Sequence, residues 1–175
     1  YPIFPTTARD ISEVFYDSPL NESLKLNDSV CTHHNGEYIE LYNPTSDSVD
    51  ISGWELEDKA SGYVFPANTK IASGSMLLVA YRYPGSNFEL STLFPSVLGK
   101  EAFILYQQYM WLSNKGEIIK LSDKTGRVID WMCYRSFGTT PGRLNYWNIN
   151  ARNGQGKPLE QLRSLQRVDI HTTHS

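Results

Sequence analysis

A chain of 175 residues is long enough to bury a substantial core, because a domain of about this size removes roughly 70% of its unfolded surface from water. Its net charge of -3, with acidic and basic residues interspersed, offers no positive surface for a phosphate backbone, so we expect no nucleic acid partner. No run of about 18 apolar residues occurs, and we therefore expect no transmembrane segment.

The first part of the chain contains one predicted strand between two irregular segments. Residues 1–10 hold two prolines and lack apolar periodicity, so we interpret them as an N-terminal arm. Residues 11–16 are the first predicted strand, which ends before Pro19. Residues 17–36 are rich in Asn, Ser and Asp, and we expect a long insertion there. Since the chain begins at Tyr1 and shows no signal segment, we expect it to be an excised part of a longer protein.

Residues 36–58 contain the clearest strand pattern. Ile39 and Leu41 alternate with polar or aromatic neighbours, which is typical of a strand with one face in the core, and we predict a strand over 37–42. Pro44 fixes its φ angle and removes a backbone donor, so the chain is expected to turn over 43–48. Further strands are predicted at 49–51 and 54–58, with Trp54 as the largest anchor of the core.

The rest of the chain predicts more strands separated by long loops. The unbroken apolar run at 76–81 favours a central strand buried on both faces, and the apolar residues of the insertion 82–100 are expected to cover the sandwich. Gly126 allows a tight turn between strands at 117–121 and 127–131. Other strands are predicted at 63–65, 70–71, 102–106 and 165–168, with a further insertion at 136–163 and a tail at 169–175.

These strands carry a family resemblance. The segments ELYNP and VDISGWELED, preceded by ISEVFYDSP and followed by LSNKGEIIKLSDKTGRVIDWMCY, resemble the lamin tail domain over residues 11–134. The resemblance implies an all-β, immunoglobulin-like β-sandwich with long loop insertions, formed by residues 11–168, and no catalytic residues. It also implies a tethering or interaction module. Because heptad repeats, a basic cluster and a C-terminal prenylation box are missing, the bacterial branch of secreted, periplasmic or cell-surface proteins is the closer match.

The sequence contains no assembled catalytic or metal-binding set, and we expect neither a cofactor nor a metal. Cys31, His33 and His34 are zinc-ligand types, but they lie too close together to complete a tetrahedron, so a solvated loop is the preferred interpretation. Glu55 and Glu57 should share a solvent-facing side of one strand, where burial would not raise a carboxyl pKa. Calcium ligands are an alternative for three aspartates that we interpret as turn formers, Asp47, Asp50 and Asp58.

Two cysteines leave one disulfide pairing open. A bridge between Cys31 and Cys133 would close a loop of about 100 residues and contribute about 4–5 kcal/mol on the chain-entropy model. The alternative is two free thiols, one buried and one exposed. The sequence does not decide between them.

A glycine-punctuated segment near the C-terminus is the predicted binding site. Its rings suit apolar faces and its amides suit hydroxyls or peptide groups, and the residues concerned are Tyr146, Trp147, Asn148, Asn150 and Arg152. The alternative is that Trp147 is a plug on the end of the sandwich.

The predicted function is that of a non-enzymatic interaction or tethering module. We expect a monomer as an isolated domain, with a protein or a cell-envelope component, including a glycan, as partner. Two alternatives remain open: a carbohydrate-binding module that uses Tyr146 and Trp147, and an accessory domain of a larger hydrolase whose active site lies elsewhere.

Overall fold

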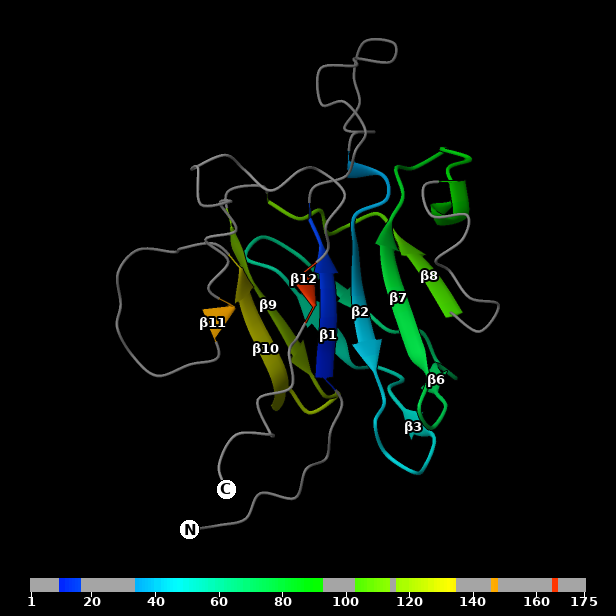
Figure 1. The fold of residues 1–175 in the computed structure, drawn as a ribbon, viewed down its shortest axis with the longest axis vertical. Helices are drawn as coiled ribbons and strands as arrows, with labels where there is room; N and C mark the ends of the chain where they lie inside the picture. The colour runs from blue at the N-terminus through cyan, green and yellow to red at the C-terminus, as the bar shows by residue number, and fades with distance from the viewer. Residues whose placement is uncertain are drawn as a thin grey trace.

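Two five-stranded sheets and one short two-stranded sheet make up the described part of the protein (Figure 1). The structure is a computed structural model that describes residues 10–16, 34–92, 103–113, 116–134, 146–147 and 165–166. In spatial order, the first sheet contains β12 (Leu165–Gln166), β1 (Asp10–Phe15), β2 (Tyr38–Tyr42), β7 (Met76–Tyr81) and β8 (Phe103–Gln107). The second contains β11 (Tyr146–Trp147), β10 (Val128–Tyr134), β9 (Glu117–Ser122), β4 (Glu55–Glu57) and β5 (Gly62–Val64), and the small sheet pairs β3 (Val49–Asp50) with β6 (Lys70–Ile71).

The predicted all-β sandwich is confirmed. A single turn of 3-10 helix, η2 (Leu90–Thr92), is the one helical element that lies wholly within the described ranges, and His34 is the last residue of another 3-10 turn. No helix there is long and apolar enough to cross a membrane. The strands predicted at 37–42 and 76–81 are β2 and β7, and the predicted closing strand is β12, which pairs antiparallel with β1. The predicted domain limits of 11–168, with an arm and a tail, remain a prediction, although β1 already starts at Asp10.

The core lies between the two large sheets. In β2, Ile39 and Leu41 are buried while Tyr38, Glu40 and Tyr42 are half-buried on the other face, as the alternation predicts. Trp54 is 5% exposed and belongs to the same apolar cluster, so its predicted place in the core is confirmed. Apolar residues from both sheets complete this cluster, among them Ile11, Val14, Leu56, Leu77, Val79, Ile119, Leu121 and Met132.

The segment after β7, described for residues 82–92 and called the covering segment below, lies over the outer face of the first sheet. Leu78 and Ala80 of β7 point away from the main core, yet they are buried with Leu90 of η2 in a second apolar cluster. Phe88 and Tyr106 pack against this cluster. The central strand is therefore buried on both faces, as its apolar run predicts, and the prediction that the insertion covers the sandwich is confirmed for the described residues.

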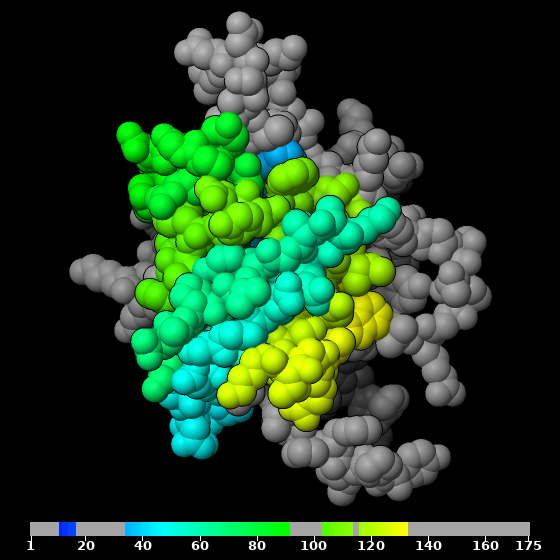
Figure 2. All heavy atoms as spheres, turned by 180° about the vertical axis from the view of Figure 1, so that it is seen from behind, coloured from blue at the N-terminus to red at the C-terminus, as the bar shows by residue number. Residues whose placement is uncertain are grey.

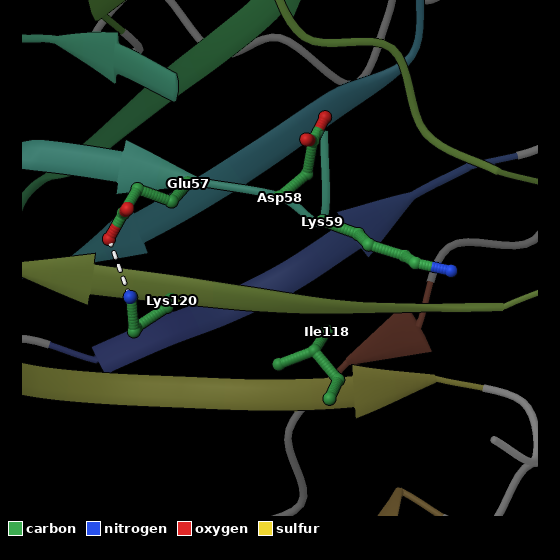
Figure 3. A pocket seen from close by; sticks show the side chains of 5 residues that line it. All are labelled: Glu57, Asp58, Lys59, Ile118 and Lys120. Atoms are coloured by element: carbon green, nitrogen blue, oxygen red, sulfur yellow. Dashed lines mark ion pairs between the residues drawn. The ribbon is translucent and has the colours of Figure 1, made fainter. Parts of the chain in front are cut away.

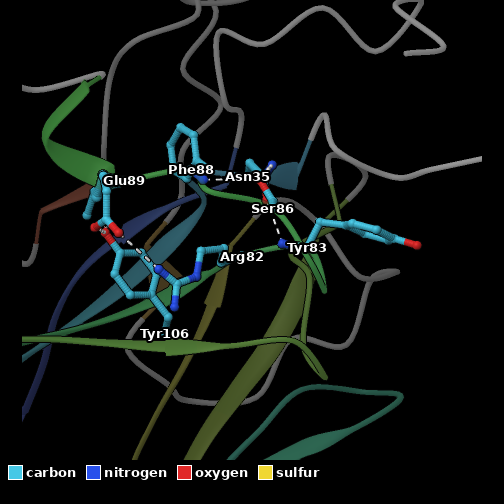
Figure 4. A network of polar contacts seen from close by, with 8 residues as sticks. Asn35, Arg82, Tyr83, Ser86, Phe88, Glu89 and Tyr106 are labelled. Atoms are coloured by element: carbon cyan, nitrogen blue, oxygen red, sulfur yellow. Dashed lines mark hydrogen bonds and ion pairs between the residues drawn. The ribbon is translucent and has the colours of Figure 1, made fainter. Parts of the chain in front are cut away.

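A polar network holds this covering segment in place (Figure 4). The Arg82 guanidinium lies 4.0 Å from the centre of the Tyr106 ring and 3.1 Å from Glu89 Oε1. The Tyr106 hydroxyl donates to Glu89 Oε2 and accepts the backbone N–H of Leu90, both at 2.8 Å. At the other end of the segment, Asn35 Oδ1 accepts the N–H of Tyr83 at 2.7 Å. These contacts fix the loop where it covers β7.

The turn between β9 and β10 is built around one aspartate. Asp123 accepts the N–H groups of Thr125 and Arg127, at 2.9 and 3.1 Å, and the Thr125 hydroxyl at 2.5 Å. Gly126 has φ of 82°, a left-handed conformation that favours glycine. The predicted hairpin is thus confirmed, although β10 starts one residue later than the predicted strand and ends three residues later, at Tyr134. The hydrogen bond from the Thr125 hydroxyl is the main cause that lowers the pKa of Asp123 to about 2, from a usual 3.8.

We predict that this lowered pKa makes the hairpin acid-sensitive. A depressed carboxyl pKa stabilises the folded state above the unfolded value of 3.8, and that contribution is lost as the pH falls through about 2. Asp123→Asn should therefore be less stable than the wild type at pH 5, and the difference in Tm should shrink toward pH 2. Thermal unfolding across this range measures it, and Thr125→Ala should reduce the same pH dependence. A Tm difference that stays constant with pH would contradict the assignment.

Candidate functional site

The predicted binding segment lies mostly outside the described residues. Tyr146 and Trp147 form β11, which pairs in parallel with β10 opposite Cys133 and Tyr134. The structure describes their backbone but not their side chains, and Asn148, Asn150 and Arg152 fall outside the described ranges. The binding patch and the plug therefore both remain predictions.

The disulfide also remains a prediction. Cys133 lies in β10, opposite Ile118 of β9, but Cys31 is outside the described part of the chain, as is His33. His34 is described, and its Nδ1 lies 2.6 Å from Glu37 Oε1. No cluster of three or more His, Cys, Asp or Glu side chains that could hold a metal ion is found among the described residues.

The aspartates considered as calcium ligands are occupied in turns. Asp50 Oδ1 accepts the N–H of Ser52 at 2.9 Å. Asp58 Oδ1 accepts the N–H groups of Ala60 and Ser61, both at 2.6 Å. The interpretation as turn formers is confirmed for Asp50 and Asp58, whereas for Asp47, whose Oδ2 accepts the Ser46 hydroxyl at 3.4 Å, it stays a prediction.

A shallow depression on the outer face of the second sheet is the first candidate site. Seen from behind, β4 and β5 (turquoise) cross the middle of this face, beside the yellow residues of the β9–β10 hairpin (Figure 2). The depression has a volume of about 470 Å³ and is lined by Glu57, Asp58, Lys59, Ile118 and Lys120.

The charges of the depression do not converge on one point. Lys120 Nζ lies 2.8 Å from Glu57 Oε2, so these two side chains form an ion pair with each other, whereas Asp58 and Lys59 extend away from Ile118 (Figure 3). Glu55 and Glu57 share the outer face of β4, as predicted. A surface of this kind offers one exposed isoleucine and no group poised for chemistry.

The segment after β8 is the better candidate, because its backbone is fixed while its aromatic rings are exposed. Gln107 is 7% exposed, and its Nε2 donates to the Met110 carbonyl at 2.6 Å. Its Oε1 accepts the N–H groups of Tyr109 and Met110, both at 2.7 Å. One buried side chain thus holds a three-residue turn from inside.

Side chains alternate between core and solvent along this segment. Met110 and Leu112 are buried, whereas Tyr109 is 57% and Trp111 49% exposed. Anchoring the two aliphatic side chains fixes the side of the segment that faces outward. The two large rings therefore reach the surface on a backbone that is already ordered, which reduces the entropy lost when a partner binds.

His34 and Tyr81 extend the ring cluster around Trp111. The His34 ring stacks on Trp111 with centroids 6.0 Å apart and an interplanar angle of 29°, and Tyr81 meets both rings edge-on. Glu37, 3% exposed, binds His34 through Oε1 and accepts the N–H of Leu112 through Oε2 at 2.7 Å. We refer to His34, Tyr109 and Trp111 as the aromatic surface.

Two exposed aromatic rings give the aromatic surface its chemical character. Exposed indole and phenol rings offer large apolar areas with one polar atom each, which is the composition enriched at protein interfaces. The sequence analysis did not identify this site. The alternation of Tyr109 and Trp111 with Met110 and Leu112 was a visible signal, but it did not say which pair faced the core.

Comparison with known protein families gives a match over most of the chain. The sequence model described as Lamin Tail Domain matches residues 6–136, which include both large sheets up to β10 and the whole aromatic surface. No curated protein matches the sequence.

Proposed function

The chain belongs to the lamin tail domain family of non-enzymatic, immunoglobulin-like domains, and from this premise we propose that it is an interaction module of a secreted or cell-surface bacterial protein. The module binds a protein or another component of the cell envelope. The aromatic surface is its contact site.

The observation that carries this proposal is the exposure of Trp111 on an ordered segment. The ring is 49% exposed, while Gln107 and Glu37 supply buried acceptors for the N–H groups of the residues on either side of it. Binding sites use rigid aromatic anchors of this kind, and tryptophan and tyrosine are enriched among residues that dominate binding energy.

The proposed location of the protein rests on its family resemblance. The resemblance of its motifs to the bacterial branch of the family supports a secreted, periplasmic or cell-surface protein. A carbohydrate-binding module that uses Tyr146 and Trp147 is the alternative, and a glycan array separates the two.

We predict that Trp111→Ala weakens binding to an isolated cell-envelope fraction by at least about tenfold, since truncating a central aromatic contact typically costs 2 kcal/mol or more. Its free energy of unfolding should fall by less than about 1.5 kcal/mol, because half of the ring is already in solvent. Binding isotherms and urea denaturation of the same protein samples give both numbers.

Phe103→Ala is the matched control, because Phe103 is also aromatic and 53% exposed but lies at the start of edge strand β8. It should bind like the wild type. Equal binding by Trp111→Ala and the wild type would reject the aromatic surface as the contact site. A glycan array tests the alternative: saturable sugar binding that is lost in Trp147→Ala, but kept in Trp111→Ala, would favour the carbohydrate-binding module.

A further inference from the structure

We propose that protonation of His34 regulates the aromatic surface, so that it binds its partner more tightly at mildly acidic than at mildly alkaline pH. The regulation of binding rests on the function proposed above. The protonation-dependent change in the environment of Trp111 does not, and it can be measured without a partner.

The Glu37 carboxylate connects the imidazole to the backbone of the aromatic segment. Its Oε1 lies 2.6 Å from His34 Nδ1, and its Oε2 accepts the N–H of Leu112, the residue after Trp111, at 2.7 Å. The carboxylate is 3% exposed, so water does little to weaken either contact. A change of charge on the imidazole therefore acts on the same carboxylate that holds the segment.

Ring contacts provide a second connection. The imidazole stacks on Trp111 at 6.0 Å and meets Tyr81 edge-on at 6.1 Å. An imidazolium is attracted by the negative faces of aromatic rings, with indole the strongest acceptor, whereas a neutral imidazole lacks this attraction. Protonation thus strengthens the contact of His34 with both the carboxylate and the indole.

Among the described residues, the charged groups around His34 favour this effect. Glu37 lies on the turn that precedes β2, and it supplies a negative charge. Tyr81, at the end of β7, contributes a phenol ring that meets the imidazole edge-on. Arg82 follows Tyr81, but its guanidinium is engaged with the Tyr106 ring and with Glu89. The segment 107–113 contributes Trp111, which does not titrate.

These contacts determine that protonation of His34 raises the affinity of the aromatic surface. In its protonated form His34 holds Trp111 in place through the stacked ring and through Glu37, so less conformational freedom is lost on binding. When the pH rises and the imidazole becomes neutral, the hydrogen bond to Glu37 loses its charge assistance and the stacking loses its cation–π part. The affinity of the aromatic surface should then fall.

Fluorescence tests the protonation step on the isolated protein. The difference between the emission of the wild type and that of Trp111→Phe isolates the signal of Trp111 from the other three tryptophans. This difference, and its quenching by acrylamide, should change in one transition between about pH 5 and 8. His34→Gln keeps a donor for Glu37 but cannot titrate, and it should abolish the transition while leaving the other three histidines in place.

Glu37→Gln is the second variant, because it removes the negative charge but keeps the imidazole. Its transition should persist and move to lower pH, since the imidazolium loses its charged partner. A flat signal in the wild type, a transition that survives in His34→Gln, or an unchanged midpoint in Glu37→Gln would each overturn the proposal. Urea midpoints of the variants show whether they are folded.

Binding tests the regulatory step. The wild type should bind the cell-envelope fraction about fivefold more tightly at about pH 5.5 than at about pH 8. The affinity of His34→Gln should be the same at both pH values. A Trp111 transition without a pH-dependent affinity would overturn the regulation alone. Loss of the proposed function has a different signature, because Trp111→Ala would then bind like the wild type at both pH values.

Discussion

Replacing Trp54 with alanine should lower the free energy of unfolding by about 3–5 kcal/mol, a large part of a typical domain stability of about 5–15 kcal/mol. The side chain is 5% exposed and packs in the main apolar cluster between the sheets. Its backbone bonds to Ile51 and Phe65 hold this position on both sides, so the surrounding chain cannot easily collapse into the cavity. Urea denaturation followed by circular dichroism measures the loss.

Two further variants make the Trp54 result specific. Trp54→Phe keeps most of the apolar contact and should be less destabilising than Trp54→Ala. Trp111→Ala removes the same number of atoms from a ring that is 49% exposed, and it should cost less than about 1.5 kcal/mol. A Trp54→Ala protein with the urea midpoint of the wild type would show that the ring does not support the core.

Asn43→Ala is expected to have the second-largest effect, about 2–4 kcal/mol, because it leaves several backbone groups without a partner. Asn43 is fully buried. Its Nδ2 contacts the carbonyls of Asp47, Ile71 and Ala72 at 2.8 to 3.0 Å, and its Oδ1 accepts the N–H and hydroxyl of Thr45. One amide thereby joins the turn after β2 to the end of β6.

Two further variants test the amide of Asn43 and its buried position separately. Asn43→Asp keeps the acceptor but presents a carboxylate to the three carbonyls, so it should be at least as destabilising as Asn43→Ala. Asn87→Ala, an exposed control on the covering segment, should change the free energy of unfolding by less than about 0.5 kcal/mol. If Asn43→Ala and Asn87→Ala have equal urea midpoints, the buried amide contributes nothing to stability.

Local patterns in the sequence were sufficient to predict most strands. The alternation around Ile39, the apolar run of β7 and the glycine turn between β9 and β10 depend on neighbouring residues, so they can be read without knowing the pairing. The register shift between Ile11 and Glu13 in β1 could not be read in this way. The N–H of Ile11 bonds to Asp130 Oδ2 at 2.8 Å, a partner that is 119 residues away.

The candidate site was missed for the same physical reason. Trp111 and Met110 are both large apolar residues, and their contrasting exposure is set by partners outside the local pattern. Gln107 places Met110 in the core, and Glu37, 75 residues before Leu112 in sequence, holds the following N–H. Sequence reasoning found a cluster of rings and amides at 146–152, but burial decides which aromatic residues are available to a partner.

The parallel pairing of β7 with β8 limits how the length of the protein can change. Parallel neighbours cannot be joined by a tight hairpin. The chain leaves the sheet where β7 ends and must cross back to the edge of the sheet at which β7 begins, which takes about a dozen residues or more. Residues 82–102 make this connection, and Leu90 within it covers the outer face of β7. Deletions that leave fewer than about a dozen residues would strain the return path, and deletions that remove Leu90 would uncover apolar residues of β7. Insertions beyond η2 would add little to the entropy of closing the loop. Length variation among homologous domains should therefore be asymmetric here, with longer connections tolerated and shorter ones selected against.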